Sequence, residues 1–236
     1  MPNKPQMFAF TYAGGTAAFF EGIEKEVPEL AWVKPDYPGH GVRRKEAFQN
    51  NFDELGDDLF ARFRKAYTGG RYALFGYSMG AIALCEVLRR ILAAGEPAPD
   101  RVFLAAHEPR TKAELAGYRE DELDEWVKER TIRFGGIPQK LIGNQSFWRM
   151  YLPLYRADYT LIGRYRFETL DLRTEIPATI FYSGTDTPRR EMEAWRRIFT
   201  GECEFAEYSG NHFFIQEHHG EMAEIIRKRM VPAAEQ

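Results

Sequence analysis

The stretch Gly76-Tyr77-Ser78-Met79-Gly80 lies between an apolar run at residues 72–75 and a helical pattern at residues 81–88. This order of strand, G-x-S-x-G and helix is typical of a nucleophile elbow, a tight turn that strains the serine backbone and exposes its hydroxyl. Glycines on either side remove side chains that would clash with the neighbouring strand and helix. The five-residue motif also arises by chance, but its strand-to-helix context indicates Ser78 as a nucleophile.

A serine nucleophile needs a base and an orienting acid, which follow it in the order Ser, Asp or Glu, His where such an elbow is used. His212 lies in a Gly/Asn turn after the strand-like residues 203–207, and is the expected base. Asp186 follows the buried strand pattern at residues 178–182. Sites in an open parallel sheet form at the carboxyl ends of the strands, so Asp186 is the expected acid.

Alternatives stay open for several of these residues. Asp186 could instead cap the helix expected over residues 188–199. Asp158 is the rival acid, although its helical, aromatic-rich surroundings favour a structural hydrogen bond. His40 is interpreted as a loop residue, and His107, at the end of a strand-like run, could line the cleft without acting as the base.

Acyl transfer also requires backbone N–H groups aimed at the developing oxyanion. The N–H of Met79, directly after the nucleophile, is the first expected donor. The second is expected from Ala13 or Gly14, in the loop that follows the first strand. The paired glycines of that loop let the backbone approach a substrate closely, so Gly14 is also expected to bind substrate.

Strand-like runs alternate with helical segments in both terminal thirds of the chain. The runs cover residues 7–10, 31–35, 72–75, 102–106, 178–182 and 203–207. Alternation of this kind predicts an α/β fold with a mostly parallel sheet and helices on both faces. Together with the elbow motif it indicates the alpha/beta-hydrolase fold. Residues 1–109 and 171–236 are expected to form this core.

Residues 110–170 have no convincing strand and are expected to form a helical lid over the cleft. Most of the lid aromatics are expected to form its own core, but some should face the cleft and line an acyl channel. The channel candidates are Phe134, Ile137, Phe147, Trp148 and Leu152. Phe147 and Trp148, together with Tyr77 in the elbow and Phe213 beside His212, are the expected substrate contacts.

Composition limits the class of protein further. A chain of 236 residues suits one domain with an insertion, and its net charge of −3 argues against a nucleic-acid binder. Two cysteines give no disulfide framework, so a reducing, cytoplasmic location is expected. No signal peptide, membrane-spanning run, phosphate loop or metal-ligand spacing is present in the sequence, so we expect no membrane association, no metal and no cofactor.

Several segments together resemble the type II thioesterases, stand-alone editing hydrolases of polyketide and nonribosomal peptide pathways within the alpha/beta-hydrolase thioesterase family. The matching segments are Tyr12-Ala13-Gly14-Gly15, Tyr37-Pro38-Gly39, the elbow, Phe134-Gly135-Gly136-Ile137-Pro138, residues 152–159 and Gly210-Asn211-His212-Phe213-Phe214. The resemblance implies that Ser78 is the nucleophile, His212 the base and Asp186 its partner. The family usually has proline in place of Thr11, arginine in place of His40 and glycine in place of Asn211.

The resemblance also implies a reaction and a partner. The expected reaction is hydrolysis of acyl groups from the phosphopantetheine arm of acyl or peptidyl carrier proteins, with the arm supplied by the carrier or by coenzyme A. A medium-chain acyl thioesterase, a carboxylester hydrolase and a non-catalytic acyl-binding protein are the alternatives. We expect a monomer, with Arg43-Arg44-Lys45 and Arg189-Arg190 as docking candidates for an acidic carrier or, alternatively, as solvated surface.

Overall fold

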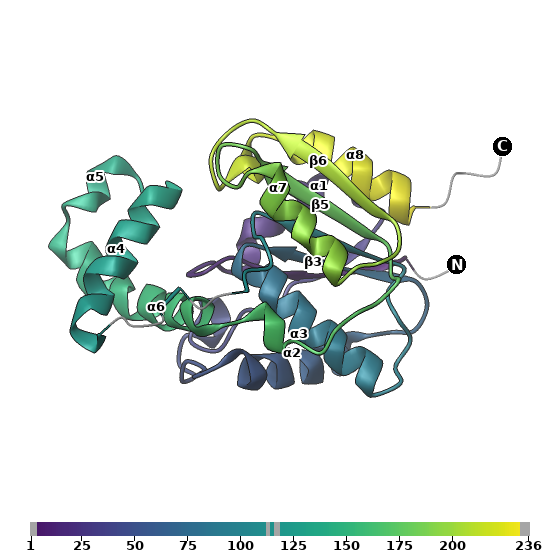
Figure 1. The fold of residues 1–236 in the computed structure, drawn as a ribbon, viewed down its shortest axis with the longest axis horizontal. Helices are drawn as coiled ribbons and strands as arrows, with labels where there is room; N and C mark the ends of the chain where they lie inside the picture. Colours follow the sequence, from purple (N-terminus) through teal and green to yellow (C-terminus); the bar gives the residue numbers. More distant parts are fainter. Residues whose placement is uncertain (1–3, 112–113, 116–118, 232–236) are drawn as a thin grey trace.

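A single sheet of six strands organises the protein in this computed structural model, which describes residues 4–111, 114–115 and 119–231 (Figure 1). Parts of the expected core, residues 1–3 and 232–236, and of the expected lid, residues 112–113 and 116–118, lie outside the described residues. The strand order is β2-β1-β3-β4-β5-β6, and each neighbouring pair is parallel. The predicted α/β fold with a parallel sheet is confirmed.

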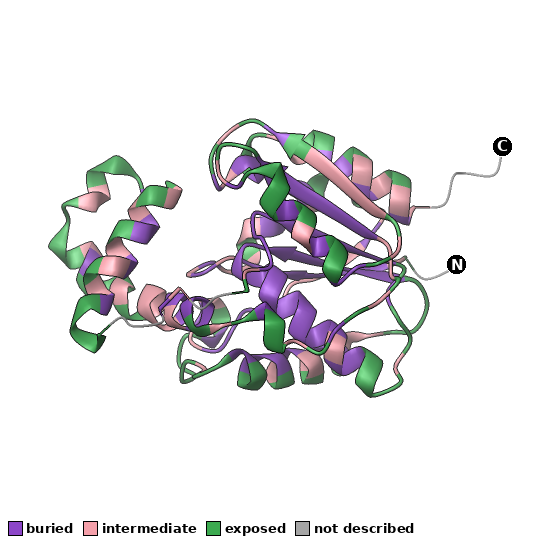
Figure 2. Ribbon diagram, viewed as in Figure 1, coloured by how far each residue is buried: buried purple, intermediate pink, exposed green. Residues whose placement is uncertain are grey.

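The strands lie where the sequence patterns predicted them, with small shifts at their ends. Their bounds are β1 Gln6–Phe10, β2 Ala31–Val33, β3 Tyr72–Tyr77, β4 Arg101–Ala105, β5 Ala178–Ser183 and β6 Cys203–Tyr208. β2 ends before Pro35, because proline has no N–H to donate to the ladder. β1, β3, β4 and β5 are buried along their whole length, as expected of parallel strands covered on both faces (Figure 2).

Helices cover both faces of the sheet. On one face, α2 (Phe52–Ala66) and α3 (Met79–Ala93) pack through apolar residues such as Leu59 and Leu84. On the other, α1 (Glu21–Glu26) and α8 (His219–Met230) enclose a second apolar cluster. The remaining short elements are α7 (Arg189–Met192) and the 3₁₀ segments Ala17–Phe20, Gly41–Arg43, Glu120–Glu122, Phe167–Thr169, Glu193–Arg197 and Phe214–Gln216.

The segment between β4 and β5 is helical over most of its described residues. It contains α4 (Leu123–Phe134), α5 (Gln139–Ile142) and α6 (Gln145–Arg164), which extend away from the sheet at the left of Figure 1. α5 has no buried residue, whereas the second half of α6 contains nearly all of that helix's buried residues (Figure 2). This helical insertion is therefore attached to the core through the end of α6.

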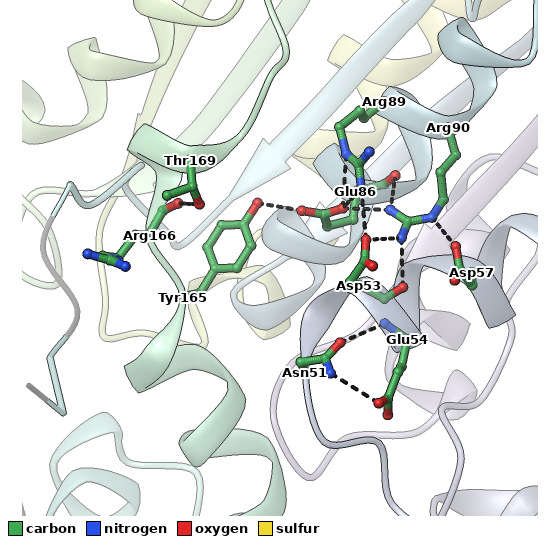
Figure 3. A network of polar contacts seen from close by, with 10 residues as sticks. All are labelled: Asn51, Asp53, Glu54, Asp57, Glu86, Arg89, Arg90, Tyr165, Arg166 and Thr169. Carbon is green, nitrogen blue, oxygen red and sulfur yellow. Dashed lines mark hydrogen bonds and ion pairs between the residues drawn. The ribbon is translucent and has the colours of Figure 1, made fainter.

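A polar network around the buried side chains of Glu86 and Arg90 fixes that attachment (Figure 3). Arg90 of α3 donates to Glu86 one turn earlier at 2.6 Å, to Asp53 at 2.5 Å and to Asp57 at 2.7 Å, which joins α3 to α2. Tyr165, the residue after α6, donates its hydroxyl to the other oxygen of Glu86 at 2.8 Å. The end of the insertion is thus bonded to α3, the helix that begins directly after Ser78.

Candidate active site

The turn between β3 and α3 has the backbone of a nucleophile elbow. Ser78 is the N-cap of α3, with φ of 55° and ψ of −117°, a strained conformation for a residue other than glycine. Its N–H donates to Ala105 O of β4 at 2.8 Å. A Cβ atom on Gly80 would overlap the Phe10 carbonyl, and one on Gly76 would overlap the Gly80 carbonyl. Both glycines are therefore required for the close approach of strand and helix.

The structure brings Ser78, His212 and Asp186 together at the carboxyl ends of β3, β6 and β5. His212 Nε2 lies 2.8 Å from Ser78 Oγ, and His212 Nδ1 lies 2.8 Å from Asp186 Oδ2. Because a carboxylate only accepts, Nδ1 carries the hydrogen and Nε2 of the neutral ring accepts from the serine hydroxyl. The N-cap of α7 is Pro188, so Asp186 does not cap that helix.

Two aromatic residues hold the histidine loop. The Phe134 ring, at the end of α4, stacks on the His212 ring with centroids 4.2 Å apart. The Tyr77 hydroxyl donates to His212 O at 2.7 Å from a fully buried side chain. Tyr77 therefore anchors the loop that carries His212. It does not line the cavity at Ser78, contrary to the sequence expectation, because its side chain lies in the apolar core on the other side of β3 from the cleft.

The loop after β1 is held by the insertion. Gly14 N–H donates to Asp158 Oδ2 of α6 at 2.6 Å, and Gly15 N–H closes a turn onto Tyr12 O at 2.9 Å. Because its N–H is occupied, Gly14 is not an oxyanion donor in this conformation. Ala13 stays the candidate from this loop, together with Met79, whose N–H at the first position of α3 has no acceptor within the helix.

Asp158 also contacts a buried histidine. His40 Nε2 lies 2.8 Å from Asp158 Oδ2, and His40 Nδ1 lies 3.0 Å from Pro38 O. Both partners are acceptors, so both ring nitrogens carry hydrogens and His40 is an imidazolium. Burial lowers the pKa of His40, but Asp158, the Pro38 carbonyl and Asp36 together raise it by more, so the net pKa lies above its ordinary value. His40 is thus a charged, buried anchor rather than a plain loop residue, and Asp158 has the structural role favoured from its surroundings.

A cavity of about 460 Å³ opens beside Ser78 and His212. Besides the three hydrogen-bonded residues, it is lined by Ala106, His107, Glu108, Arg110, Arg130, Arg133, Phe134, Tyr159, Ile162, Thr185, Thr187 and Asn211. Burial lowers the pKa of His107 to about 3, so this residue is neutral, and it lines the cleft as the sequence suggested.

Three of the expected substrate contacts lie elsewhere. Trp148 donates its indole N–H to Ile142 O at 2.7 Å, and the Phe147 ring packs on Trp148 and Tyr151. Phe147 thus belongs to the insertion's own packing, whereas Trp148 and Leu152 line a separate cavity between α4 and α6. Phe213 packs edge-on to Tyr12 at 4.9 Å, outside the residues that line the Ser78 cavity.

The sequence reading missed the arginines of the Ser78 cavity. Arg130 and Arg133 lie on α4, which reads as an amphipathic helix with a solvated charged face. The available signal was spacing: Arg130, Arg133 and Phe134 stand at i, i+3 and i+4, so they share one helix face with the ring that stacks on His212. Arg110, which follows β4, gave no comparable signal.

Over residues 4–111, 114–115 and 119–231, no group of three or more His, Cys, Asp or Glu side chains is placed to hold a metal ion. None of the helices in this described part of the chain is long and apolar enough to cross a membrane.

The parallel sheet, the strained elbow and the serine–histidine–aspartate contact define an alpha/beta-hydrolase. Within that class the chain belongs to the thioesterase family, since residues 5–230 match its Thioesterase domain. It is 27% identical to the gramicidin S biosynthesis protein GrsT of Aneurinibacillus migulanus, over 96% of this chain and 89% of GrsT.

Two further relatives bear on the type of thioesterase. The solved type II thioesterase BorB from the borrelidin biosynthetic cluster is 28% identical with a TM-score of 0.79, and the match covers 98% of this chain and 94% of BorB. The human medium-chain S-acyl fatty acid synthase thioesterase is 23% identical over 89% of this chain and 80% of that protein. The resemblance to type II thioesterases predicted from the sequence is confirmed.

Proposed function

We propose that this protein is a stand-alone type II thioesterase that releases acyl groups from the phosphopantetheine arm of carrier proteins in polyketide or nonribosomal peptide synthesis. The chain of hydrogen bonds from Ser78 through His212 to Asp186, on a strained elbow in a thioesterase-family chain, carries the proposal. Matches spanning nearly all of GrsT and BorB support the pathway.

Acylation begins when His212 Nε2 takes the proton of Ser78 Oγ as the oxygen attacks the thioester carbonyl. The N–H groups of Ala13 and Met79 bind the resulting oxyanion. The C–S bond then breaks, the pantetheine sulfur leaves with the proton held by His212, and the acyl group stays on Ser78. A water molecule, deprotonated by His212, repeats the attack and frees the acid.

Asp186 supports both steps from the far side of the ring. Its carboxylate accepts the Nδ1 hydrogen and so holds the tautomer in which Nε2 can accept the serine proton. It also stabilises the imidazolium formed during attack without becoming protonated. Every proton is therefore transferred by a residue of this chain, and no metal or redox group is needed for the proposed reaction.

The leaving group is tested by comparing matched substrates. We expect kcat/KM on an acyl-pantetheine thioester to be at least about tenfold higher than on the oxygen ester with the same acyl group. A tenfold difference corresponds to ~1.4 kcal/mol in transition-state free energy. A higher value on the ester would favour a carboxylester hydrolase. Faster turnover of medium-chain acyl groups than of short ones, on carrier protein and coenzyme A alike, would favour the activity named for the human relative.

We place the carrier near α7. Arg189 and Arg190 are exposed at the start of α7, two residues beyond Thr187 of the Ser78 cavity. In the other predicted cluster, Arg43-Arg44-Lys45, the first residue is not available for docking. Arg43 is buried, and its guanidinium donates to Glu46 in its own loop and to Asp58 of α2. An acidic carrier would meet the α7 arginines as it directs its arm toward Ser78.

Reversing the charge of Arg190 is expected to slow association with an acyl-carrier protein and lower kcat/KM by about tenfold at low salt, with less effect at high salt. Hydrolysis of small acyl-pantetheine should keep its rate. Arg71→Glu is the matched control, because Arg71 is an exposed arginine directly before β3, at the end of the strands opposite to Ser78. Equal losses of Arg190→Glu on both substrates would count against carrier docking.

A further inference from the structure

The cavity beside Ser78 contains three arginines, which is unusual for a channel meant to hold a purely apolar acyl chain. Arg110 follows β4, and Arg130 and Arg133 lie on α4. Glu108 pairs with Arg110, and Glu114 is shared between Arg110 and Arg130. The three cations thus have two carboxylates to balance them.

Arg130 is the most constrained of the three. Only 8% of it is exposed, and the rings of Trp126, Phe134 and Tyr159 surround its guanidinium with centroids 5.2, 5.0 and 5.8 Å from Cζ. Its two terminal nitrogens pair with Glu114 at 3.0 and 2.8 Å. Its Nε has no hydrogen-bond acceptor among the described residues. A buried charged donor without an acceptor is costly, and a ligand in the cavity could supply one.

The surrounding groups do not remove this excess charge. Asp186 is bonded to His212, and His107 is neutral. Arg133 packs over the Phe134 ring at 5.3 Å and forms no ion pair with any residue that the structure describes. Burial and the neighbouring Arg110 lower the pKa of Arg130 to about 10, so it stays charged at neutral pH while lacking a full set of partners.

We propose that the acyl group hydrolysed at this site carries a carboxylate, which Arg130 binds with the help of Arg133 while the thioester carbonyl lies at Ser78. This inference rests on the proposed function and narrows its substrate class to carboxyacyl thioesters. A guanidinium suits the task, because its planar N–H groups match the two oxygens of a carboxylate. Phe134 connects the two parts of the site, since its ring contacts both the Arg130 guanidinium and the His212 ring.

An anionic oxygen could also come from the phosphate of the pantetheine arm. Arg130 is buried in the same cavity as the nucleophile, which favours a group on the acyl side of the thioester. Thioesters of pantetheine, which has no phosphate, therefore test the carboxylate alone. The same acyl groups on phosphopantetheine show whether the phosphate is bound instead.

The test uses pairs of acyl-pantetheines that differ only in a carboxylate or an isopropyl end: succinyl against 4-methylpentanoyl, glutaryl against 5-methylhexanoyl, and adipyl against 6-methylheptanoyl. The wild-type protein should prefer the carboxylate in at least one pair. In Arg130→Met the ratio of the two kcat/KM values should fall by about 10- to 100-fold, the range of a charge-assisted hydrogen bond. Arg130→Lys, which keeps the charge, should lose less.

Lys128→Met is the matched control, because Lys128 is a cation on the same helix but lines the separate cavity at Trp148. The ratio of kcat/KM values should not change in this variant. Free glutarate should inhibit the wild-type protein more strongly than 5-methylhexanoate, a measurement that needs no variant to fold. A wild-type preference for the neutral member of every pair, or an unchanged ratio in folded Arg130→Met, would overturn the inference. A preference that appears only on phosphopantetheine would assign the arginine to the phosphate, whereas failure to hydrolyse any thioester would overturn the proposed function itself.

Discussion

Asp186→Asn is expected to lower kcat for thioester hydrolysis on the order of 10⁴-fold, the loss known for the same change in the serine protease triad. The side chain keeps its shape, but an amide N–H facing Nδ1 favours the wrong tautomer of His212. The ring would then present a hydrogen, rather than a lone pair, to Ser78 Oγ. Single-turnover kinetics on an acyl-pantetheine measure the loss directly.

Ser78→Ala and His212→Ala give the reference for that variant. Because the three residues act as a unit, each should remove most of the hydrolysis, and adding Asp186→Asn to either should cost little more. All variants should keep the fold, since the side chains are polar groups at strand ends and not members of the apolar clusters. Near-normal turnover in Asp186→Asn would show that another group orients His212.

The regular part of this fold could be predicted from the chain, because each element follows a local pattern. Apolar runs such as residues 72–75 and 178–182 became β3 and β5, and the elbow between β3 and α3 has the strain that its glycines indicated. The order of Ser78, Asp186 and His212 along the chain was enough to bring them together, since parallel strands deliver their carboxyl ends to one edge.

The interior of the site could not be predicted in the same way, because it depends on how the insertion packs on the core. Trp148 was predicted to line an acyl channel, yet its indole N–H donates to Ile142 O within the insertion. Tyr77 is next to the nucleophile in sequence, but strand alternation turns it to the opposite face. No sequence pattern singled out Arg130, which reaches the site only because α4 packs over His212. The contact between α4 and His212 joins residues far apart in sequence, and composition gives no signal for it.

The second large effect is expected at Asp158, which we consider a positioning residue. Asp158→Asn should lower kcat by about 10²-fold, the cost of displacing a reacting group or donor by about 1 Å, with a smaller change in KM. The reason is geometric: the carboxylate accepts from Gly14 N–H and from His40, and so fixes the loop that carries the proposed Ala13 donor. Both donors bond to the same oxygen, Oδ2, and a neutral amide oxygen in its place cannot balance the charge of His40, so the contacts that fix this loop should weaken.

The kinetics of Asp158→Asn separate positioning from acid catalysis. If Asp158 oriented the catalytic histidine, its loss would approach that of Asp186→Asn, and the two changes together would cost no more than one. Because it acts through the oxyanion loop instead, we expect the two losses to multiply. A kcat close to that of the wild type, in a protein with an unchanged melting temperature, would contradict this role.

The same anchor predicts a pH dependence. Since the pKa of His40 is raised in the folded protein, the ion pair with Asp158 is complete below the ordinary histidine pKa and is lost as the pH rises through the raised value. Asp36 nearby also raises the pKa of His40. The oxyanion loop should therefore loosen on the alkaline side, and kcat/KM should fall there. His40→Arg replaces the titrating ring by a cation that stays charged, the residue usual at this position in type II thioesterases, and should remove the alkaline fall. Persistence of the fall in a folded His40→Arg protein would assign it to another group.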